Sequence, residues 1–199
     1  NISSLNAVSL VKHHGDIEAD LTLAACDVIC VNETFLSSES TENVALPDFD
    51  LYKCGGGRGK GVAIYTRRDF APANHCCIDE AKHQIIRLQY IHLDIIAIYI
   101  SPSKPDLTLA MMELQELIEP NKKTIICGDF NMDPSSNMVS NVLRELGFSQ
   151  IVRGHTHIKG RTLDHFYIRP FKSITHHFMH PLYFSDHNAV CVSLKKEDD

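Results

Sequence analysis

The sequence has no long hydrophobic run, no tryptophan and no pair of cysteines at C-x-x-C spacing. Its longest uninterrupted apolar stretch, Ile95–Ile100, has the length of a β-strand, whereas a membrane-spanning helix needs about 20 such residues. The first residues lack a basic segment followed by an apolar one, so we expect no signal peptide. These absences argue against a membrane protein and favour an intracellular one.

The cysteines are seven in number, which is odd. An odd count without C-x-x-C spacing argues against a disulfide framework and against a thiolate zinc site, and it favours a reducing compartment. We therefore expect Cys76 and Cys77 to be reduced thiols although they are adjacent.

Linkers, repeats and low-complexity tracts are also lacking. The chain has 199 residues, of which 44% are hydrophobic and 22% charged, values that are ordinary for a globular protein. We expect one domain over residues 1–199.

Short runs rich in β-branched residues and bounded by turn residues predict strands. The predicted strands are Val28–Val31, Val62–Thr66, Gln84–Tyr90, Leu93–Ile100, Thr124–Cys127, Leu163–Ile168 and Ala189–Leu194.

Helices are predicted in three segments. Apolar residues recur at helical spacing in residues 107–119, after Asp106, and in residues 136–146, before Gly147. A third helix is predicted over residues 17–25, with Asp16 before it. Because several strands follow one another through short turns, we predict an α/β protein in which two sheets pack face to face with helices outside.

The net charge is −6, and the charged residues are distributed unevenly along the sequence. Residues 1–50 contain one lysine and nine acidic residues, and residues 53–87 contain seven lysines or arginines and three acidic residues. The acidic part could suit a cation and the basic part a phosphate, or both could be solvated faces. The candidate phosphate-binding residues are Lys53, Arg58, Lys60, Arg67 and Arg68.

Carboxylates and a histidine stand where predicted strands end or begin. Glu33 follows the first of these strands, Asp129 and Asn131 follow another, Asp164 lies in a third, and Asp186-His187 precedes the last. Carboxylate oxygens suit Mg²⁺, and a nearby histidine can carry a proton near neutral pH. Together these groups could hydrolyse a phosphate ester, although each motif alone also fits an exposed acid or a turn.

Taken in order, seven motifs resemble the endonuclease/exonuclease/phosphatase superfamily, whose fold is a two-sheet α/β sandwich. Within it, the chain is most similar to the apurinic-like endonuclease domains of mobile elements. Both non-LTR retrotransposons and Helitron-type transposons remain possible hosts. The motifs are Asn1–Leu5, Glu33-Thr34, Gly61–Tyr65, Tyr99–Pro102, Gly128–Asn131, Leu163–His165 and Ser185–His187.

The resemblance implies a Mg²⁺ site for which Mn²⁺ would substitute. Glu33 would be the main ligand, with Asn1 and Asp186 nearby. The family has strand residues before the asparagine that matches Asn1, so we expect the chain to be trimmed at its N-terminus. Ser3 stands where some members have an acid, which weakens the case for a second metal.

For catalysis, the resemblance implies that Asp129 orients or deprotonates the attacking water and that Asn131 positions Asp129 or the phosphate. Asp164 would hydrogen-bond His187 and favour an imidazolium that contacts a non-bridging phosphate oxygen. Tyr99 would face the phosphate or the leaving oxygen.

The function that follows is a Mg²⁺-dependent DNA endonuclease that nicks target DNA for a mobile element, as part of a larger polyprotein acting in the nucleus. The resemblance implies that abasic-site enzymes of this superfamily wall their pocket with aromatic residues, and since this chain has no tryptophan, we expect intact duplex rather than abasic sites to be the substrate. Alternatives are a phosphatase or phosphodiesterase on a small phosphorylated substrate and a catalytically inactive nucleic-acid-binding module. His155 and His157 could form a zinc pair on one strand face, but no further ligands are suitably spaced.

Overall fold

The computed structural model describes residues 1–36, 43–135, 138–170, 172 and 174–195, and within them the chain forms two six-stranded sheets. The first sheet has the order β11 (Ile174–Pro181), β12 (Asn188–Leu194), β1 (Ile2–Asn6), β2 (Val28–Asn32), β4 (Val62–Arg67) and β3 (Phe49–Cys54). The second has the order β5 (Asn74–Asp79), β6 (His83–Gln89), β7 (Leu93–Ile100), β8 (Lys123–Asp129), β10 (Asp164–Arg169) and β9 (Ser149–Gln150).

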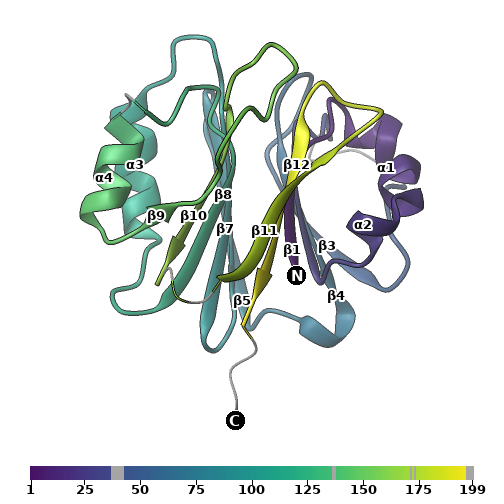
Figure 1. Ribbon diagram of the computed structural model, residues 1–199, viewed down its shortest axis with the longest axis horizontal. Coiled ribbons are helices and arrows are strands. Elements are labelled where there is room, and N and C mark those ends of the chain that lie inside the picture. The colour runs from purple at the N-terminus through teal and green to yellow at the C-terminus, as the bar shows by residue number, and fades with distance from the viewer. Residues whose placement is uncertain (37–42, 136–137, 171, 173, 196–199) are drawn as a thin grey trace.

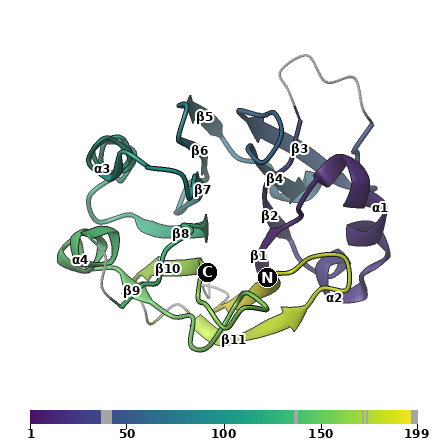
Figure 2. The ribbon, with the colours of Figure 1, turned by 90° about the horizontal axis from the view of Figure 1, so that it is seen from above.

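Each sheet contains one parallel pair near its centre, β1 with β2 and β7 with β8. A parallel pair needs a crossover connection, which is usually helical. Here α1 (Leu10–Ala19) and α2 (Leu21–Ala24) connect the first pair and α3 (Leu107–Glu116) connects the second. Figure 2 shows α1 and α2 on the outer side of one sheet and α3 and α4 (Met138–Glu145) on the outer side of the other. The predicted two-sheet α/β sandwich is confirmed.

Three apolar layers hold this arrangement together. One lies between the sheets and includes Cys30, Ile95 and Phe166. The two others lie between each sheet and its helices and include Ile29 and Ile126. Successive strand residues point to opposite faces, so a central strand that is covered on both sides is expected to be mostly apolar. This is why the central strands read as nearly continuous hydrophobic runs.

The predicted strands all appear, and the structure adds β1, β3, β5, β9 and β11. Four of the added strands lie at sheet edges, and β5 and β11 are largely exposed. Edge strands need little apolar sequence, so their pattern is weak. The fifth, β1, is buried although two of its five residues are serines.

The predicted helix over residues 17–25 is wrong. Its residues divide between α1 and α2, and the division falls at Asp20. The Asp20 carboxylate accepts hydrogen bonds from the backbone N–H groups of Thr22 and Leu23, at 2.9 and 3.1 Å. Capping of this kind satisfies N–H groups that a helix start leaves without partners, so a second helix begins here. Helix α3 starts after Asp106 as predicted, and residues 136 and 137 of the predicted helix 136–146 lie outside the described residues.

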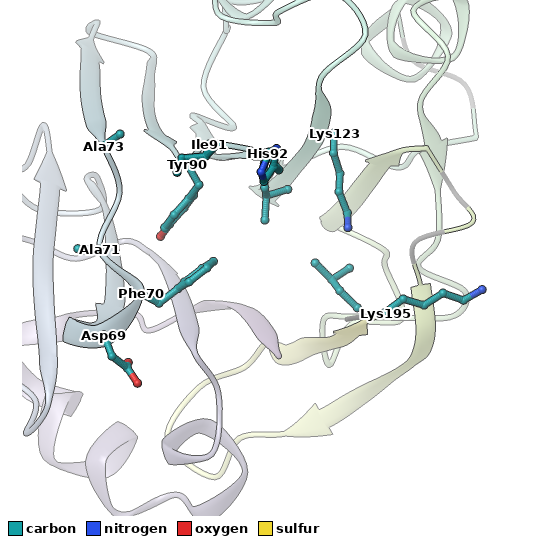
Figure 3. Close-up of a pocket in the computed structure, with 11 residues that line it drawn as sticks. Asp69, Phe70, Ala71, Ala73, Tyr90, Ile91, His92, Lys123 and Lys195 are labelled. Atoms are coloured by element: carbon teal, nitrogen blue, oxygen red, sulfur yellow. The ribbon is translucent and has the colours of Figure 1, made fainter. Parts of the chain in front are cut away.

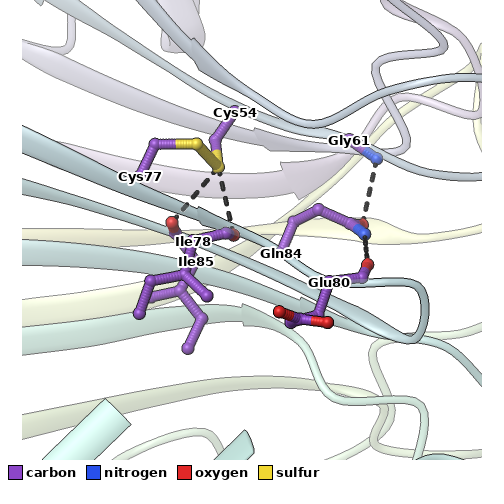
Figure 4. The surroundings of a disulfide bond; sticks show 7 residues. All are labelled: Cys54, Gly61, Cys77, Ile78, Glu80, Gln84 and Ile85. Carbon is purple, nitrogen blue, oxygen red and sulfur yellow. Dashed lines mark hydrogen bonds between the residues drawn. A yellow bond between two sulfur atoms is a disulfide. The ribbon is translucent and has the colours of Figure 1, made fainter. Parts of the chain in front are cut away.

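A disulfide joins Cys54 and Cys77, so the prediction that Cys77 is a reduced thiol is wrong. Cys54 ends β3 and Cys77 lies in β5, and these are the edge strands of the two different sheets. The bond therefore connects the two layers at one side of the sandwich (Figure 4). Neither edge strand was predicted, so nothing in the sequence indicated that these sulfurs meet. Cys76 is a free thiol.

No helix in the described part of the chain is both long enough and apolar enough to span a membrane.

Candidate active site

The strand ends of both sheets meet at one end of the sandwich, opposite the two labelled termini in Figure 1. In the first sheet, Asn6 of β1 pairs with Asn32 of β2. In the second, Tyr99 of β7 and Asp164 of β10 both pair with Asp129 of β8. Because parallel strands end at the same edge, the two central pairs bring these polar side chains together on a rigid base.

Asp164 and His187 form a buried pair across the two sheets. The Nδ1 group of His187 donates to Oδ2 of Asp164 over 2.7 Å, and the two side chains are 7% and 1% exposed. Burial alone would lower the pKa of His187, but the Asp164 hydrogen bond and the charges of Asp164, Asp129 and Asp186 raise it to about 9. The imidazole is therefore a cation near neutral pH, and its Nε2 proton is available to a ligand.

Asp129 lies beside this pair and is completely buried. Its Oδ1 accepts from the backbone N–H of Asn131 over 2.8 Å, and its own N–H donates to Oδ1 of Asn32 over 3.1 Å. Burial, together with the charge of Asp164, raises the pKa of the Asp129 carboxyl, while the His187 cation opposes this rise. A carboxylate with a raised pKa is a stronger base than a free one, which suits it to deprotonating water.

Asn6 connects the two sheets at this edge. Its Nδ2 group donates to Oε1 of Glu33 over 3.0 Å and to Oδ2 of Asp129 over 2.9 Å. The side chain is fully buried, so a single amide sets the spacing between the two carboxylates. Ser185 adds a second tie, because its hydroxyl donates to the carbonyl of Asn6 and accepts from the N–H of His187.

Asn1 is not part of the site, and its prediction as a metal ligand is wrong. Its carbonyl accepts from the N–H groups of Asp27 and Val28, at the far end of the β1–β2 pair. Five residues of strand place it about 16 Å from the Asn6 edge. Asn6 is the asparagine at the site, and strand residues do precede it. The comparison of Ser3 with the acid of some members used the same alignment to Asn1 and no longer applies.

Tyr99 and Asn131 lie beside Asp129 at the same strand ends. Burial raises the pKa of Tyr99, and the nearby charges of Glu33 and Asp129 add to the rise, so the phenol keeps its proton and remains a donor. Asn131 has a backbone φ of 54° and donates from Nδ2 to the carbonyl of Ile100 over 2.9 Å. This bond fixes the turn after β8 from which the N–H of Asn131 donates to Oδ1 of Asp129.

Asp186 is 45% exposed at the mouth of the site. Its Oδ2 lies 3.2 Å from Nε2 of His157, and its Oδ1 lies 3.9 Å from Nε2 of His187. His157 belongs to the segment before β10 and was considered only as half of a zinc pair. Within the described residues, His155 joins no group of potential metal ligands, so that pair does not form.

Asn6 and Asn32 are polar residues at the site that the sequence analysis did not single out, and it considered His157 only as a zinc ligand. For the first two a signal exists, since each is the polar last residue of a buried strand. That signal becomes meaningful only once the two strands are known to lie side by side and to end at the same edge.

A family model described as the Endonuclease/Exonuclease/phosphatase family matches residues 1–187. The chain belongs to this family. Members are metal-dependent hydrolases that act on phosphodiesters or other phosphate esters. A search among curated proteins finds no match.

Solved structures with this fold cover nearly the whole chain. The 3′ phosphatase NExo from Neisseria, bound to a product DNA hairpin, is 17% identical over 98% of this chain and 99% of its own, with a TM-score of 0.82. An AP endonuclease from Archaeoglobus fulgidus is also 17% identical, over 98% and 99%, with a TM-score of 0.77. The endonuclease domain of TRAS1, a telomere-specific non-LTR retrotransposon, is 15% identical over 98% and 97%, with a TM-score of 0.67.

The donor set fits the divalent metal of the endonuclease/exonuclease/phosphatase family. Four carboxylates converge here, from Glu33, Asp129, Asp164 and Asp186, and His187 is the cation that faces them. Within the described residues no lysine or arginine forms an ion pair with any of the four. This cluster of acidic groups, in which burial and the charge of Asp164 raise the pKa of Asp129, offers hard oxygen donors that suit Mg²⁺ or Mn²⁺. The resemblance makes Glu33, which is half-buried, and Asp186, which is exposed, the residues that would hold it.

Replacing Glu33 by glutamine should weaken metal binding and leave the fold intact. Glutamine keeps the shape of the side chain and an oxygen that can accept from Asn6, but it removes the charge. We expect the Mg²⁺ concentration for half-maximal activity to rise at least tenfold, by analogy with other changes at metal sites, while the melting temperature without metal stays the same. An unchanged Mg²⁺ requirement would remove Glu33 from the metal site.

His165, although next to Asp164, has a structural role in this family member. Its ring stacks on Phe130, with 4.5 Å between centroids, and its nitrogens contact the Tyr167 hydroxyl and the Met132 carbonyl, at 3.0 and 2.8 Å. Burial lowers the pKa of His165 to about 4. It therefore supports the turn that contains Asn131 as a neutral ring.

The low pKa of His165 predicts a loss of stability in acid. The unfolded chain binds this proton below about pH 6.5, and the folded chain binds it only below about pH 4. Stability is therefore complete above pH 6.5 and decreases as the pH falls towards 4, by about 3 kcal/mol for this group. Urea unfolding of wild type and His165→Gln at pH 7 and pH 4.5 should show a smaller acid loss in the variant. His92→Gln, at an exposed histidine, is the control and should lose as much as wild type.

Two of the five predicted phosphate-binding residues border the site. Arg58 and Lys60 belong to the loop between β3 and β4. This loop runs beside the segment after Glu33, because the N–H of Phe35 donates to the Lys60 carbonyl and the N–H of Gly57 donates to the Leu36 carbonyl. Lys53 is exposed near the end of β3 that leads into the same loop.

Arg67 and Arg68 lie at the opposite end of β4, and their assignment to the substrate is wrong. Arg67 donates to the carbonyl of Ala24 over 2.6 Å and packs over the ring of Phe49. Arg68 forms an ion pair with Asp50 at 3.7 Å. Both follow the strand away from the site, so the cationic run in the sequence is divided between the two ends of the sandwich.

A pocket of about 490 Å³ also lies at that opposite end (Figure 3). Phe70 and Tyr90 stack along one side of it, and Leu93 and Leu194 add apolar surface. None of the catalytic residues lines it. The pocket is therefore separate from the active site.

Proposed function

We propose that the protein is a Mg²⁺-dependent DNA endonuclease that nicks target DNA for a mobile element. The observation that carries this proposal is the buried Asp164–His187 pair beside Asp129, at an edge where Glu33 is half-buried and Asp186 is exposed. A DNA-bound phosphatase, an AP endonuclease and a retrotransposon endonuclease domain are among the structures with this fold, which supports DNA as the substrate.

In the proposed reaction each residue at the site has a separate role. Asp129 takes a proton from the attacking water, and Asn131 holds Asp129 in position. The His187 imidazolium donates to a non-bridging oxygen of the phosphate, where negative charge increases in the transition state. Tyr99 donates from its phenol at the same edge. When bound at Glu33 and Asp186, Mg²⁺ supplies positive charge that neutralises phosphate oxygens.

We further propose that the domain acts in the nucleus as part of a larger polyprotein. Five free cysteines favour a reducing compartment, and the Cys54–Cys77 disulfide is a feature that opposes it. Localisation of a tagged full-length protein would test this part independently of the chemistry.

The test of the activity is conversion of supercoiled plasmid to open circle, with Mg²⁺ or with EDTA. His187→Ala, purified in the same way, controls for contaminating nucleases. We expect Mg²⁺-dependent nicking by wild type alone, and undiminished nicking in EDTA would contradict the metal assignment. A panel of plain duplex, abasic oligonucleotides and small phosphorylated molecules then separates the alternatives. We expect cleavage of plain duplex.

Three outcomes of that panel would replace the proposal. Cleavage of abasic oligonucleotides alone would make this a repair enzyme. Faster turnover of small phosphorylated molecules than of DNA would favour the phosphatase alternative, which the fold shared with a mannosyl-6-phosphatase from Bacteroides thetaiotaomicron supports. DNA binding without any cleavage would favour the inactive binding module.

The loop cations predict a specific salt dependence. If Arg58 and Lys60 each neutralise one phosphate, the double alanine variant should bind duplex more weakly, and the slope of log K against log salt should fall by about 2. Arg68→Ala removes an exposed cation from the far end and should leave the slope unchanged. Fluorescence anisotropy with a non-cleavable duplex over a range of salt would measure both. Equal slopes for the double variant and wild type would place the DNA elsewhere.

A further inference from the structure

His157 is held against the Asp186-His187 segment by backbone contacts. The N–H of Ile158 donates to the carbonyl of Asp186 over 3.0 Å, and the N–H of Asn188 donates to the carbonyl of Thr156 over 2.7 Å. His157 and His187 are directly opposite each other in this short antiparallel bridge. The position of His157 relative to Asp186 is therefore fixed independently of either side chain.

The proton on the His157 ring is fixed as well. Its Nδ1 accepts from the backbone N–H of Lys159 over 3.0 Å, and an imidazole nitrogen that accepts a hydrogen bond carries no proton. The proton of the neutral ring is then on Nε2, which lies 3.2 Å from Oδ2 of Asp186. His157 therefore donates to the Asp186 carboxylate, and its ring packs edge-on against His187, with 4.7 Å between centroids.

This geometry excludes His157 as a metal ligand, although it lies within ligand distance of Asp186 and His187. A histidine ligand must present an unprotonated nitrogen to the metal. Nδ1 is engaged by the Lys159 N–H, and Nε2 carries the proton. The ring can act on a metal only through the carboxylate that it contacts.

We propose that His157 is a positioning residue that orients Asp186 for metal binding. The inference rests on the proposed function, in which Asp186 is a ligand. One carboxylate oxygen, Oδ2, is held by His157, and the other, Oδ1, is left to face the site beside His187. Hydrogen bonds to a ligating carboxylate restrict its orientation, and their loss typically costs 10- to 100-fold in metal affinity or activity.

Two substitutions at His157 separate the hydrogen bond from the packing. His157→Phe keeps a ring but removes the donor, and His157→Gln places an amide N–H near the position of Nε2. Free Mn²⁺ measured by electron paramagnetic resonance, without DNA, gives the metal affinity. We expect the Kd for Mn²⁺ to rise about tenfold or more in the phenylalanine variant and to stay within about threefold in the glutamine variant.

Nicking of plasmid over a range of Mg²⁺ concentrations should follow the same order. The phenylalanine variant should need more Mg²⁺ but approach the wild-type rate at saturation, because the groups that contact the phosphate are intact. If that variant does not fold, His157→Leu serves the same purpose. Adding His157→Phe to Asp186→Ala should change the Mn²⁺ affinity no further, since the proposed effect passes through Asp186.

Wild-type Mn²⁺ affinity in a folded donor-free variant would overturn the inference while leaving the endonuclease proposal in place. Equal losses in the phenylalanine and glutamine variants would also overturn it, because packing would then explain them. Wild-type protein that neither binds Mn²⁺ nor nicks DNA would overturn the proposed function and this inference together.

Discussion

His187→Ala should lower kcat for DNA nicking on the order of 10³-fold, which is the typical cost of losing one preorganised donor to a developing negative charge. The ring is held by Asp164 at 2.7 Å, and the raised pKa of His187, about 9, keeps it cationic at neutral pH. Its contribution is therefore present before the substrate arrives. Single-turnover nicking with saturating Mg²⁺ would measure the loss without interference from product release.

Because His187 is paired with Asp164, we also expect the effects of substitutions at the two residues to be non-additive. Asp164→Asn should cost less than His187→Ala, because the ring remains, and the double variant should be little slower than His187→Ala alone, since residues that act as a unit are strongly non-additive. Fully multiplicative losses would mean that the two residues act independently. If instead the pair only braces β10 against the start of β12, both single variants should melt at lower temperature while the folded enzyme cuts at nearly the normal rate.

The sequence predicted this pair because each member belongs to a motif with a fixed local pattern, Leu163–His165 and Ser185–His187. The strands on which they lie are also strongly apolar, so their existence was clear. What connects them is a contact between residues 23 positions apart in the chain, and it depends on β10 and β12 lying in different sheets that face each other. Spacing alone could not give that arrangement, and the family resemblance did.

Asn1 and Asn6 show where the motif was insufficient. The opening residues contain an asparagine at each end of one short strand, and a strand of five residues fixes neither which end reaches the site nor which neighbour it pairs with. The parallel register of β1 with β2 decides this, by placing Asn6 next to Asn32 and Glu33. Similarly, the ends of β4 decide that Arg58 and Lys60 lie near the site and that Arg67 does not. Direction along a strand is a tertiary property.

The disulfide was missed for a related reason. Cys54 and Cys77 lie on edge strands with little apolar alternation, so the strands themselves were not predicted. Counting cysteines gave no information on which sulfurs would meet, because that depends on two sheets stacking with β3 above β5. The central strands other than the serine-containing β1 were predicted, because burial on both faces makes their sequences apolar, while the edges and their contacts were not.

Asp129→Asn is the other substitution from which we expect a large loss, on the order of 10³-fold in kcat, within the usual range for a general base. Both oxygens of Asp129 accept hydrogen bonds, Oδ1 from the N–H of Asn131 and Oδ2 from Nδ2 of Asn6. An asparagine at this position has only one acceptor oxygen, so its amide nitrogen must face one of these two donors. The variant therefore loses the base and also carries a buried mismatch, which should lower its free energy of unfolding by about 1–3 kcal/mol.

Asn6→Asp in the Asp129→Asn background distinguishes the two effects. The carboxylate at position 6 accepts from the new amide and repairs the mismatch, but it loses the bond to Glu33 and faces that carboxylate, so stability should recover only in part. Activity should not recover, because the carboxylate now lies in β1 rather than at the end of β8 beside Asp164. Urea unfolding gives the first quantity, and single-turnover nicking at saturating Mg²⁺ gives the second. Activity that returns together with stability would show that Asp129 only supports the site, and the water would then have to be deprotonated by another group.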